Sequence, residues 1–298
     1  MEFCRGLRFT ELPRARNVRA PHSPSIVKHL HFLALLIASI AAPLTAATLE
    51  IAVQDGGWGG SSAKEIRAIA LSAGTEIARH CPRTRIGPIV VHHRDDHPQT
   101  AWERTPDGKI IVGIEARDRQ CAQIAFQFAH EFCHVLATQG NDWRRTWRAD
   151  GKPNLWLEES LAEAASLFAL RAMSRSWERS APFRNWRSYA PEFAAYAGER
   201  MRASAAGGHA DFVRWFRQNE PAMRRNPTLR TSNSIVALQL LPLLEAEPRA
   251  WEALAFLNLG TRDRRQPLAI FLAEWRQNCP PALRPFVTKV AQVLGIRM

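Results

Sequence analysis

The sequence predicts an α+β fold, in which a small mixed sheet comes first, two helices form the centre and the rest of the chain is helical. Three observations predict this class. Short runs of β-branched residues gather before residue 120. Two long segments in the middle repeat apolar residues at helical spacing. Beyond residue 172, apolar helical stretches alternate with prolines. Strands followed by a block of helices are typical of α+β proteins.

The expected strands are three segments rich in β-branched residues: Leu49–Val53, Ile86–His92 and Lys109–Ala116. A helix is expected between the first two, over Ser62–His80, where apolar residues recur at helical spacing. Between the second and third strands lies a polar stretch that contains Pro98, Pro106 and the pair Asp107-Gly108. Because such residues mark turns, we expect this stretch to be a hairpin-like connection.

Two central helices are expected, over Arg119–Gln139 and over about Asn154–Ala172. Gly140-Asn141 directly after the first is typical of a helix end. Residues 48–172 are therefore expected to form an α/β core that contains both helices. Residues 173–298 are expected to form a helical carboxyl-terminal part, with breaks at Pro191, Pro221, Pro242, Pro248 and Pro280-Pro281.

Residues 1–47 are expected to be a signal peptide. Lys28 precedes the apolar run Phe32–Ala42, and the small residues Thr45-Ala46-Ala47 follow it. A membrane-spanning helix needs about 20 apolar residues, and this run is shorter. An uncleaved anchor or a buried helix is the alternative. The stretch before Val27 is long for a leader, and translation from Val27 would give a signal peptide of ordinary length. The pattern predicts export, to the periplasm or the medium.

The chain is strongly basic, with a formal net charge of +12 and a pI of about 10.5. Its basic residues are scattered, without a dense Lys/Arg run or interleaved aromatic residues. This pattern predicts no specific nucleic-acid partner. It predicts a cationic surface, which would favour peripheral association with an anionic envelope surface.

The segment His130-Glu131-Phe132-Cys133-His134 lies in the first central helix and has the pattern of a zinc site. Residues four apart in a helix differ by about 40° around the axis and lie about 6 Å apart along it. His130 and His134 can therefore reach one ion. Glu131, beside His130, can accept a proton from water without binding the ion. The alternative is a pair of histidines that cap or pack on a helix.

The second central helix offers a third ligand. Its residues 156–163 read WLEESLAE. Together with the histidine motif, they resemble the gluzincin metallopeptidases, whose aminopeptidase N-like members carry WLNEGFAE in the matching helix. The resemblance implies that Glu159 is the third metal ligand. Ser160 replaces the family's glycine, and the connection between the two motifs is slightly longer than is typical of that branch.

The carboxylates of this helix are expected to differ in role. One apolar stripe is formed by Leu157, Leu161, Ala164 and Phe168. Glu159 and Glu163 share the opposite face, with Glu158 off to one side. Glu163 is expected to hold a ligating histidine in its tautomer, although an acidic face of this kind can also be simply solvated. Ala162 and Ala165 are small enough to let another helix approach closely.

Three further groups carry thiol or metal chemistry. Cys133 is expected to be a small buried filler, with a soft metal ligand as the alternative. After export, three pairings of the remaining cysteines are open, and Cys81 with Cys121 is preferred because Cys133 lies inside the histidine motif. Four reduced thiols are the alternative. The cluster His92–His97 is expected to be a polar loop, with a second ion site as the alternative.

The motif and the resemblance together predict an exported zinc-dependent metallopeptidase that acts on a peptide or protein substrate. The resemblance implies that the strand Lys109–Ala116 forms the sheet edge and binds the extended substrate. Glu131 is expected to be the general base. A donor to the oxyanion is expected from one of three downstream residues: Tyr189, Tyr196 or His209.

Two alternatives remain open from the sequence. One is a zinc amidase that uses the same ligands on a non-peptide or cell-envelope substrate. The other is a cationic exported binding protein with a vestigial metal site. The intact Glu131 argues against the second alternative, because a purely structural metal site needs no general base.

Overall fold

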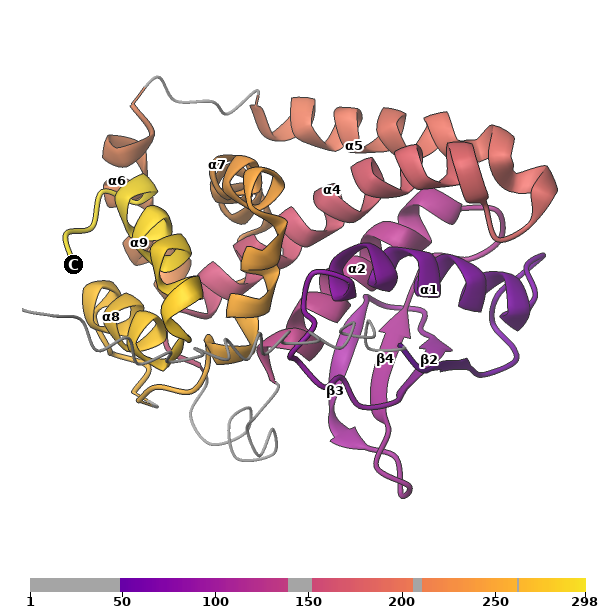
Figure 1. Ribbon diagram of the computed structural model, residues 1–298, viewed down its shortest axis with the longest axis horizontal. Helices are drawn as coiled ribbons and strands as arrows, with labels where there is room; N and C mark the ends of the chain where they lie inside the picture. The colour runs from indigo at the N-terminus through magenta and orange to yellow at the C-terminus, as the bar shows by residue number, and fades with distance from the viewer. Residues whose placement is uncertain (1–48, 139–151, 206–210, 262) are drawn as a thin grey trace, which may run out of the picture. The chain divides into compact units, whose positions relative to one another are not determined.

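A four-stranded mixed sheet forms one layer of the molecule, in the order β1-β2-β4-β3 (Figure 1). The computed structural model describes residues 49–138, 152–205, 211–261 and 263–298. The strands are β1 (Ile51–Val53), β2 (Ile89–His93), β3 (Gln99–Arg104) and β4 (Ile110–Ile114). The first two and β4 run parallel, whereas β3 pairs antiparallel with β4. The predicted α+β class, with a small mixed sheet, is confirmed.

The stretch between β2 and β4 differs from the prediction. It contains β3, and β2 runs parallel to β4, so the predicted hairpin between those two strands is wrong. The turn at Asp107-Gly108 instead joins β3 to β4, with Gly108 at a positive φ of 86°. The sequence pattern does not predict β3, because the segment QTAWER is mostly polar and shows no clear alternation of apolar and polar residues. It follows that β3, and not the segment Lys109–Ala116, is the edge strand.

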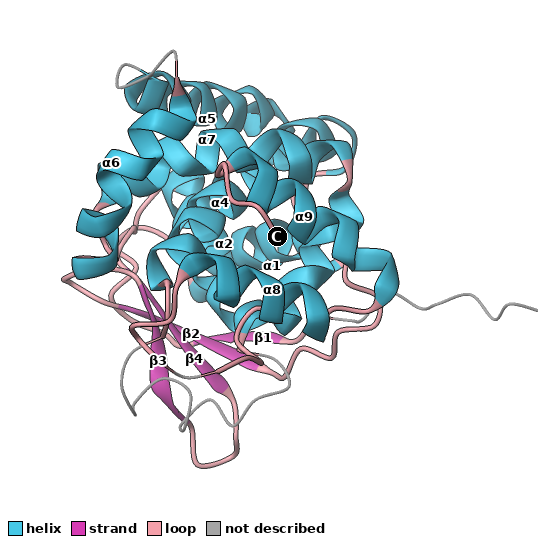
Figure 2. Ribbon diagram, turned by 90° about the vertical axis from the view of Figure 1, so that its left-hand side faces the viewer, coloured by secondary structure: helices cyan, strands magenta, loops and turns pink. Residues whose placement is uncertain are grey.

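Helices α1 (Ala63–Ala78) and α2 (Cys121–Ala137) cover one face of the sheet (Figure 2). α1 starts with a capping box, in which Ser62 and Glu65 each bond the other's backbone. The apolar residues of both helices face the interior. Ile66 of α1 and Phe128 and Phe132 of α2 are fully buried. Both helices lie within the bounds that the sequence predicts.

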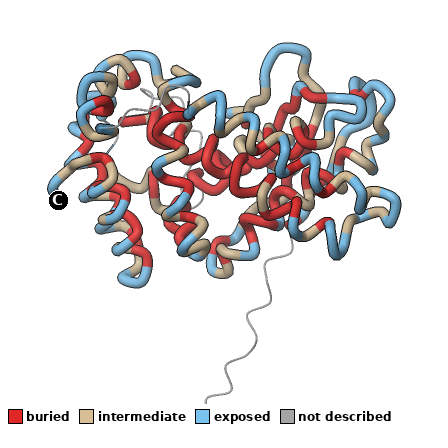
Figure 3. The backbone as a smooth tube through the Cα atoms, turned by 90° about the horizontal axis from the view of Figure 1, so that it is seen from above, coloured by how far each residue is buried: buried red, intermediate tan, exposed pale blue. Residues whose placement is uncertain are grey.

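Helix α4 (Leu155–Ser180) lies against α1, α2, α5 and α7 and is buried along most of its length. It continues beyond the predicted end at Ala172. Ser166 donates a hydrogen bond to the carbonyl of Phe126 in α2, over 2.8 Å. Ala162, one turn earlier on the same face, is fully buried. Small side chains thus let α4 approach α2 closely. The buried positions concentrate in the middle of the molecule (Figure 3).

The described part beyond α4 has no strand, as predicted. Its elements are η1 (Arg184–Tyr189), α5 (Ala190–Ala205), α6 (Phe212–Arg225), α7 (Arg230–Ala246), η2 (Pro248–Phe256), α8 (Leu268–Asn278), η3 (Pro281–Leu283) and α9 (Arg284–Val293). Pro221 and Pro242 lie inside α6 and α7, so the expected breaks there are wrong. Pro191 and Pro248 lie in first turns, where a missing N–H costs little.

The predicted signal peptide, residues 1–47, lies outside the described residues. None of the helices within the described ranges is both long and apolar enough to cross a membrane.

The predicted pair Cys81–Cys121 is wrong in this structure, where both are free thiols, as are Cys133 and Cys279. Cys121 lines a cavity with Ser61 and Glu65, beside the amino-terminal end of α1. Cys81 follows the carboxyl-terminal end of α1 and lies near the carbonyl of Ile77. A 16-residue helix separates the two ends, which is about 24 Å at the usual rise. The two sulfurs are therefore far beyond disulfide reach.

The close approach of α4 to α2 predicts a strict size limit at position 162. The variant Ala162→Leu should destabilise the protein by about 1–3 kcal/mol, because extra methylene groups force the helices apart. The measurement is the free energy of unfolding in urea. Ala194→Leu on the exposed face of α5 is the matched control and should change it by less than about 0.5 kcal/mol. Equal values for the two variants would contradict the packing.

Candidate metal centre

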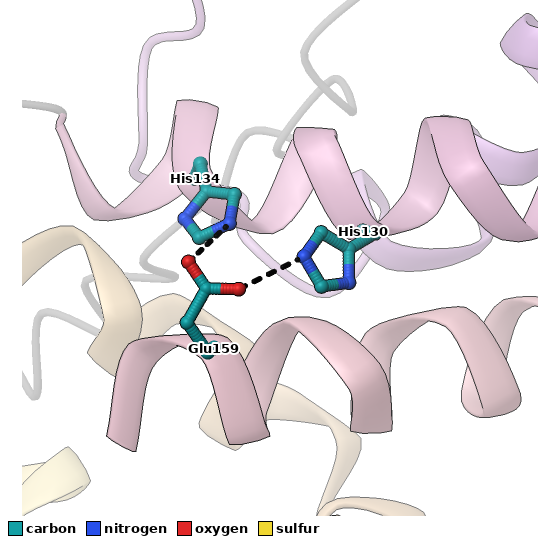
Figure 4. A group of neighbouring side chains, drawn as sticks. All are labelled: His130, His134 and Glu159. Carbon is teal, nitrogen blue, oxygen red and sulfur yellow. Dashed lines mark hydrogen bonds and ion pairs between the residues drawn. The ribbon is translucent and has the colours of Figure 1, made fainter. Parts of the chain in front are cut away.

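Two helices bring the three predicted metal ligands together. His130 and His134 project from adjacent turns of α2, with ring centroids 5.2 Å apart. Glu159 lies in the second turn of α4 and points between them (Figure 4). Its Oε2 is 3.3 Å from His130 Nε2, and its Oε1 is 3.6 Å from His134 Nε2. One donor atom from each residue lies within 4.8 Å of the others, so this group could hold a metal ion.

Glu158 is placed differently from the sequence prediction. It is buried at the site, with its Oε1 2.7 Å from His134 Nδ1. Lys152 Nζ lies 2.7 Å from each oxygen of that carboxylate, and Asn258 Nδ2 donates to Oε2 over 2.9 Å. Burial opposes ionisation, but the charge of Lys152 and the bonds from His134 and Lys152 lower the pKa of Glu158 to about 2. Glu158 is thus an ionised partner that orients the His134 ring.

Glu163 faces the other histidine, but not as closely as predicted. Its Oε2 is 4.0 Å from His130 Nδ1, which is too long for a hydrogen bond. Its Oε1 accepts from Ser234 Oγ over 3.2 Å and from Arg200 Nη2 over 3.4 Å. The predicted tautomer-holding bond is therefore absent at Glu163, and Glu158 makes such a bond to His134. Glu158 and Glu163 are thus each paired with a basic side chain from outside α4, Lys152 and Arg200 respectively.

Glu131 is buried beside the two histidines and bonds to the edge strand. Thr100 Oγ1 of β3 lies 2.9 Å from Glu131 Oε2 and 3.1 Å from the Glu131 carbonyl oxygen. Only 4% of Glu131 is exposed, yet it lines the same cavity as the ligand group. A carboxylate in this position can exchange protons with a molecule in the cavity.

A cavity of about 360 Å³ lies in front of the ligand group. One wall is the segment His97–Trp102 that leads into and along β3, and Trp102 there is 39% exposed. The opposite walls come from α2, α4 and the start of α7, where Arg230 and Asn233 lie. The cavity is thus lined by the candidate ligands, the candidate base and residues of the outer strand β3.

Neither Tyr189 nor Tyr196, the two predicted oxyanion donors that the structure describes, lines this cavity. Tyr189 lies at the start of α2, where its hydroxyl accepts from the Ala122 backbone N–H over 3.3 Å. The Tyr196 ring packs edge-to-face on Phe126 at 5.8 Å. His209 lies outside the described residues. Among the residues with donor groups that do line the cavity are Arg230 and Asn233. Neither carries a sequence motif that could have singled it out.

The other candidate metal groups are not assembled. In the cluster His92–His97, Arg94 pairs with Asp96 over 2.7 Å, and His93 Nε2 lies 3.0 Å from the Glu115 carbonyl. Within the described residues, the group at His130 is the one that brings three donors together. Cys133 is fully buried, and burial raises the pKa of its thiol. It therefore packs as the small filler that the sequence predicts.

No protein-family model, no curated protein and no solved structure matches this chain. Function is therefore inferred from the geometry and chemistry of this site.

The three carboxylates of α4 should differ in their effect on zinc binding. Glu159→Gln should lose zinc most severely, because it replaces an anionic ligand oxygen with a neutral amide oxygen, which binds zinc more weakly. Glu158→Gln should cost about 10–100-fold in affinity, as for an outer partner of a ligand, and Glu163→Gln should cost less. Competition with a chromophoric chelator measures the affinities. Glu158→Gln alone leaves the buried Lys152 without a charged partner. The double variant Lys152→Met/Glu158→Gln is therefore the control that separates this effect from the loss of the bond to His134. Tight zinc binding by Glu159→Gln would remove it from the ligand set.

Zinc binding should also release a proton from His134. Burial lowers the pKa of this imidazole, but Glu159, Glu158 and Glu131 outweigh that effect and raise it to about 9 in the metal-free protein. At pH 7 the ring is protonated, so zinc must displace that proton, and affinity should fall about tenfold per pH unit below pH 9. Calorimetry in buffers of different ionisation enthalpy should find about one proton released at pH 7. Zero release would contradict the assignment.

Proposed function

We propose that this chain is an exported, zinc-dependent metallopeptidase. The observation that carries the proposal is the convergence of His130, His134 and Glu159 on one point, with Glu131 beside them in the same cavity. Ligands and base come from two helices that pack closely, so the group is held rigidly before any substrate binds.

The donor set and its spacing fit zinc. Two imidazole nitrogens and one carboxylate oxygen, with a position left open, are typical of catalytic zinc sites. Donors about 2.0–2.1 Å from a tetrahedral ion lie about 3.3 Å apart. The Glu159 carboxylate comes about this close to both histidines, through Oε2 to His130 over 3.3 Å and through Oε1 to His134 over 3.6 Å, and one donor atom from each of the three residues lies within 4.8 Å of the others. Glu158 bonds His134 at Nδ1, which leaves Nε2 directed towards Glu159.

The chain's own groups then divide the work of hydrolysis. Zinc, when bound, would supply Lewis acidity that polarises the scissile carbonyl and makes water a better nucleophile. Glu131 accepts the proton of the attacking water and passes it to the leaving amine. Arg230 and Asn233, on the far wall of the cavity, can donate hydrogen bonds to substrate oxygens.

The outer position of β3 in the sheet favours an extended peptide over a compact amide as the substrate. One side of β3 pairs with β4, and no strand of the described chain pairs with its other side. An extended chain can add there through main-chain hydrogen bonds. Trp102, exposed on this strand, offers an apolar surface to a side chain of that peptide. A zinc amidase on a cell-envelope substrate would use the same ligands without this edge.

Glu131→Gln should keep zinc and lose hydrolysis. The amide is nearly isosteric but cannot take a proton, and loss of a general base costs about 10²–10⁴-fold in kcat. The measurements are zinc content and turnover of a mixed peptide library, with chelator added and removed. Glu178→Gln, exposed in the last turns of α4, is the matched control. Full turnover by Glu131→Gln would rule out its role, and cleavage of envelope glycopeptides alone would favour the amidase.

A further inference from the structure

The candidate base is fastened by a hydroxyl from another layer of the fold. Thr100 lies on β3, is 5% exposed and directs Oγ1 to within 2.9 Å of Glu131 Oε2. It also lies 3.1 Å from the carbonyl oxygen of Glu131. A threonine hydroxyl has one proton to donate. That proton goes to the carboxylate, since charged acceptors bind more strongly and the helical carbonyl already accepts a bond from the next turn.

The two oxygens of Glu131 are consequently unequal. Oε2 accepts the bond from Thr100, whereas no hydrogen bond to Oε1 is found among the described residues. Glu131 lines the cavity in front of the ligand group. Thr100 therefore anchors one oxygen, and Oε1 is the oxygen to which no described residue donates a hydrogen bond.

We propose that Thr100 is a positioning residue that fixes the Glu131 carboxylate, so that Oε1 is the atom that exchanges the proton with water. This inference rests on the proposed function. The hydrogen bond from Thr100 restricts rotation of the Glu131 carboxylate, so Oε1 keeps its position when the proton is transferred. Because a misplacement of about 1 Å can cost about 10²-fold in rate, a single hydrogen bond here can matter to turnover.

The position of Thr100 also links base and substrate. Thr100 pairs with Val112 in the sheet, and the register shifts between Thr100 and Arg104. Gln99 and Trp102, its neighbours on β3, line the same cavity. A peptide that adds to this edge would bind to the strand that holds the base. The same strand would then position both the scissile bond and Glu131.

The test compares Thr100→Val, which removes the hydroxyl at nearly constant shape, with Thr100→Ser, which keeps it. Thr100→Val should lower kcat by roughly 10–100-fold with KM within about twofold, and Thr100→Ser should stay within a few-fold of wild type. In a Glu131→Gln background, Thr100→Val should cause no further loss, because its effect acts through the carboxylate. Zinc content and thermal unfolding show that each variant is folded and loaded.

A second measurement needs neither zinc nor activity. Crystal structures of the metal-free wild type and Thr100→Ser should show one Glu131 carboxylate position, and Thr100→Val should show a rotated or split one. An unchanged carboxylate, or unchanged kcat in Thr100→Val, would overturn the proposal, as would an equal loss in the Glu131→Gln background. A wild-type protein that binds zinc but hydrolyses nothing would reject the proposed function, while the crystallographic result would still decide the role of Thr100.

Discussion

Four carboxylates (Glu131, Glu158, Glu159 and Glu163) and two imidazoles lie between α2 and α4, among buried alanine, leucine and phenylalanine side chains. Burying charge in such a layer is costly unless each group is paired or bonded. Glu158 has Lys152 and Asn258, Glu163 has Arg200 and Ser234, and Glu131 has Thr100. The architecture around the two helices depends on this requirement, because each partner comes from a different element.

This requirement explains why the site is distributed along so much of the chain. The ligand group itself needs only the two helices α2 and α4. The hydrogen-bond partners of the surrounding carboxylates come from β3, the residues before α4, α5, α7 and the residues after η2. The helical carboxyl-terminal part is therefore more than a cover for the core. It supplies hydrogen-bond donors to the buried carboxylates of Glu158 and Glu163.

The sequence predicted the parts that depend on short-range periodicity. Four-residue spacing predicts that His130 and His134 lie on one side of a helix. The resemblance of WLEESLAE to the gluzincin helix implies that Glu159 is the third ligand. Prediction from the sequence failed where partners are distant in sequence. The helical pattern predicts that Glu158 lies to one side of the site. Its burial there depends on Lys152, outside the motif, and on Asn258, 100 positions away. β3 was missed because an edge strand with a polar exposed face lacks a clear alternation.

Asn258 Nδ2 donates both to Glu158 and, over 3.0 Å, to the Ala137 carbonyl at the end of α2. The Asn258 amide thereby bonds both to the carboxyl-terminal end of α2 and to the first turn of α4. A ribosome makes both ligand helices long before it makes this amide. During synthesis the two histidines and four carboxylates are therefore present before Asn258 can bond to Glu158 and to the end of α2. The candidate metal centre gains this bond only after position 258 has been made.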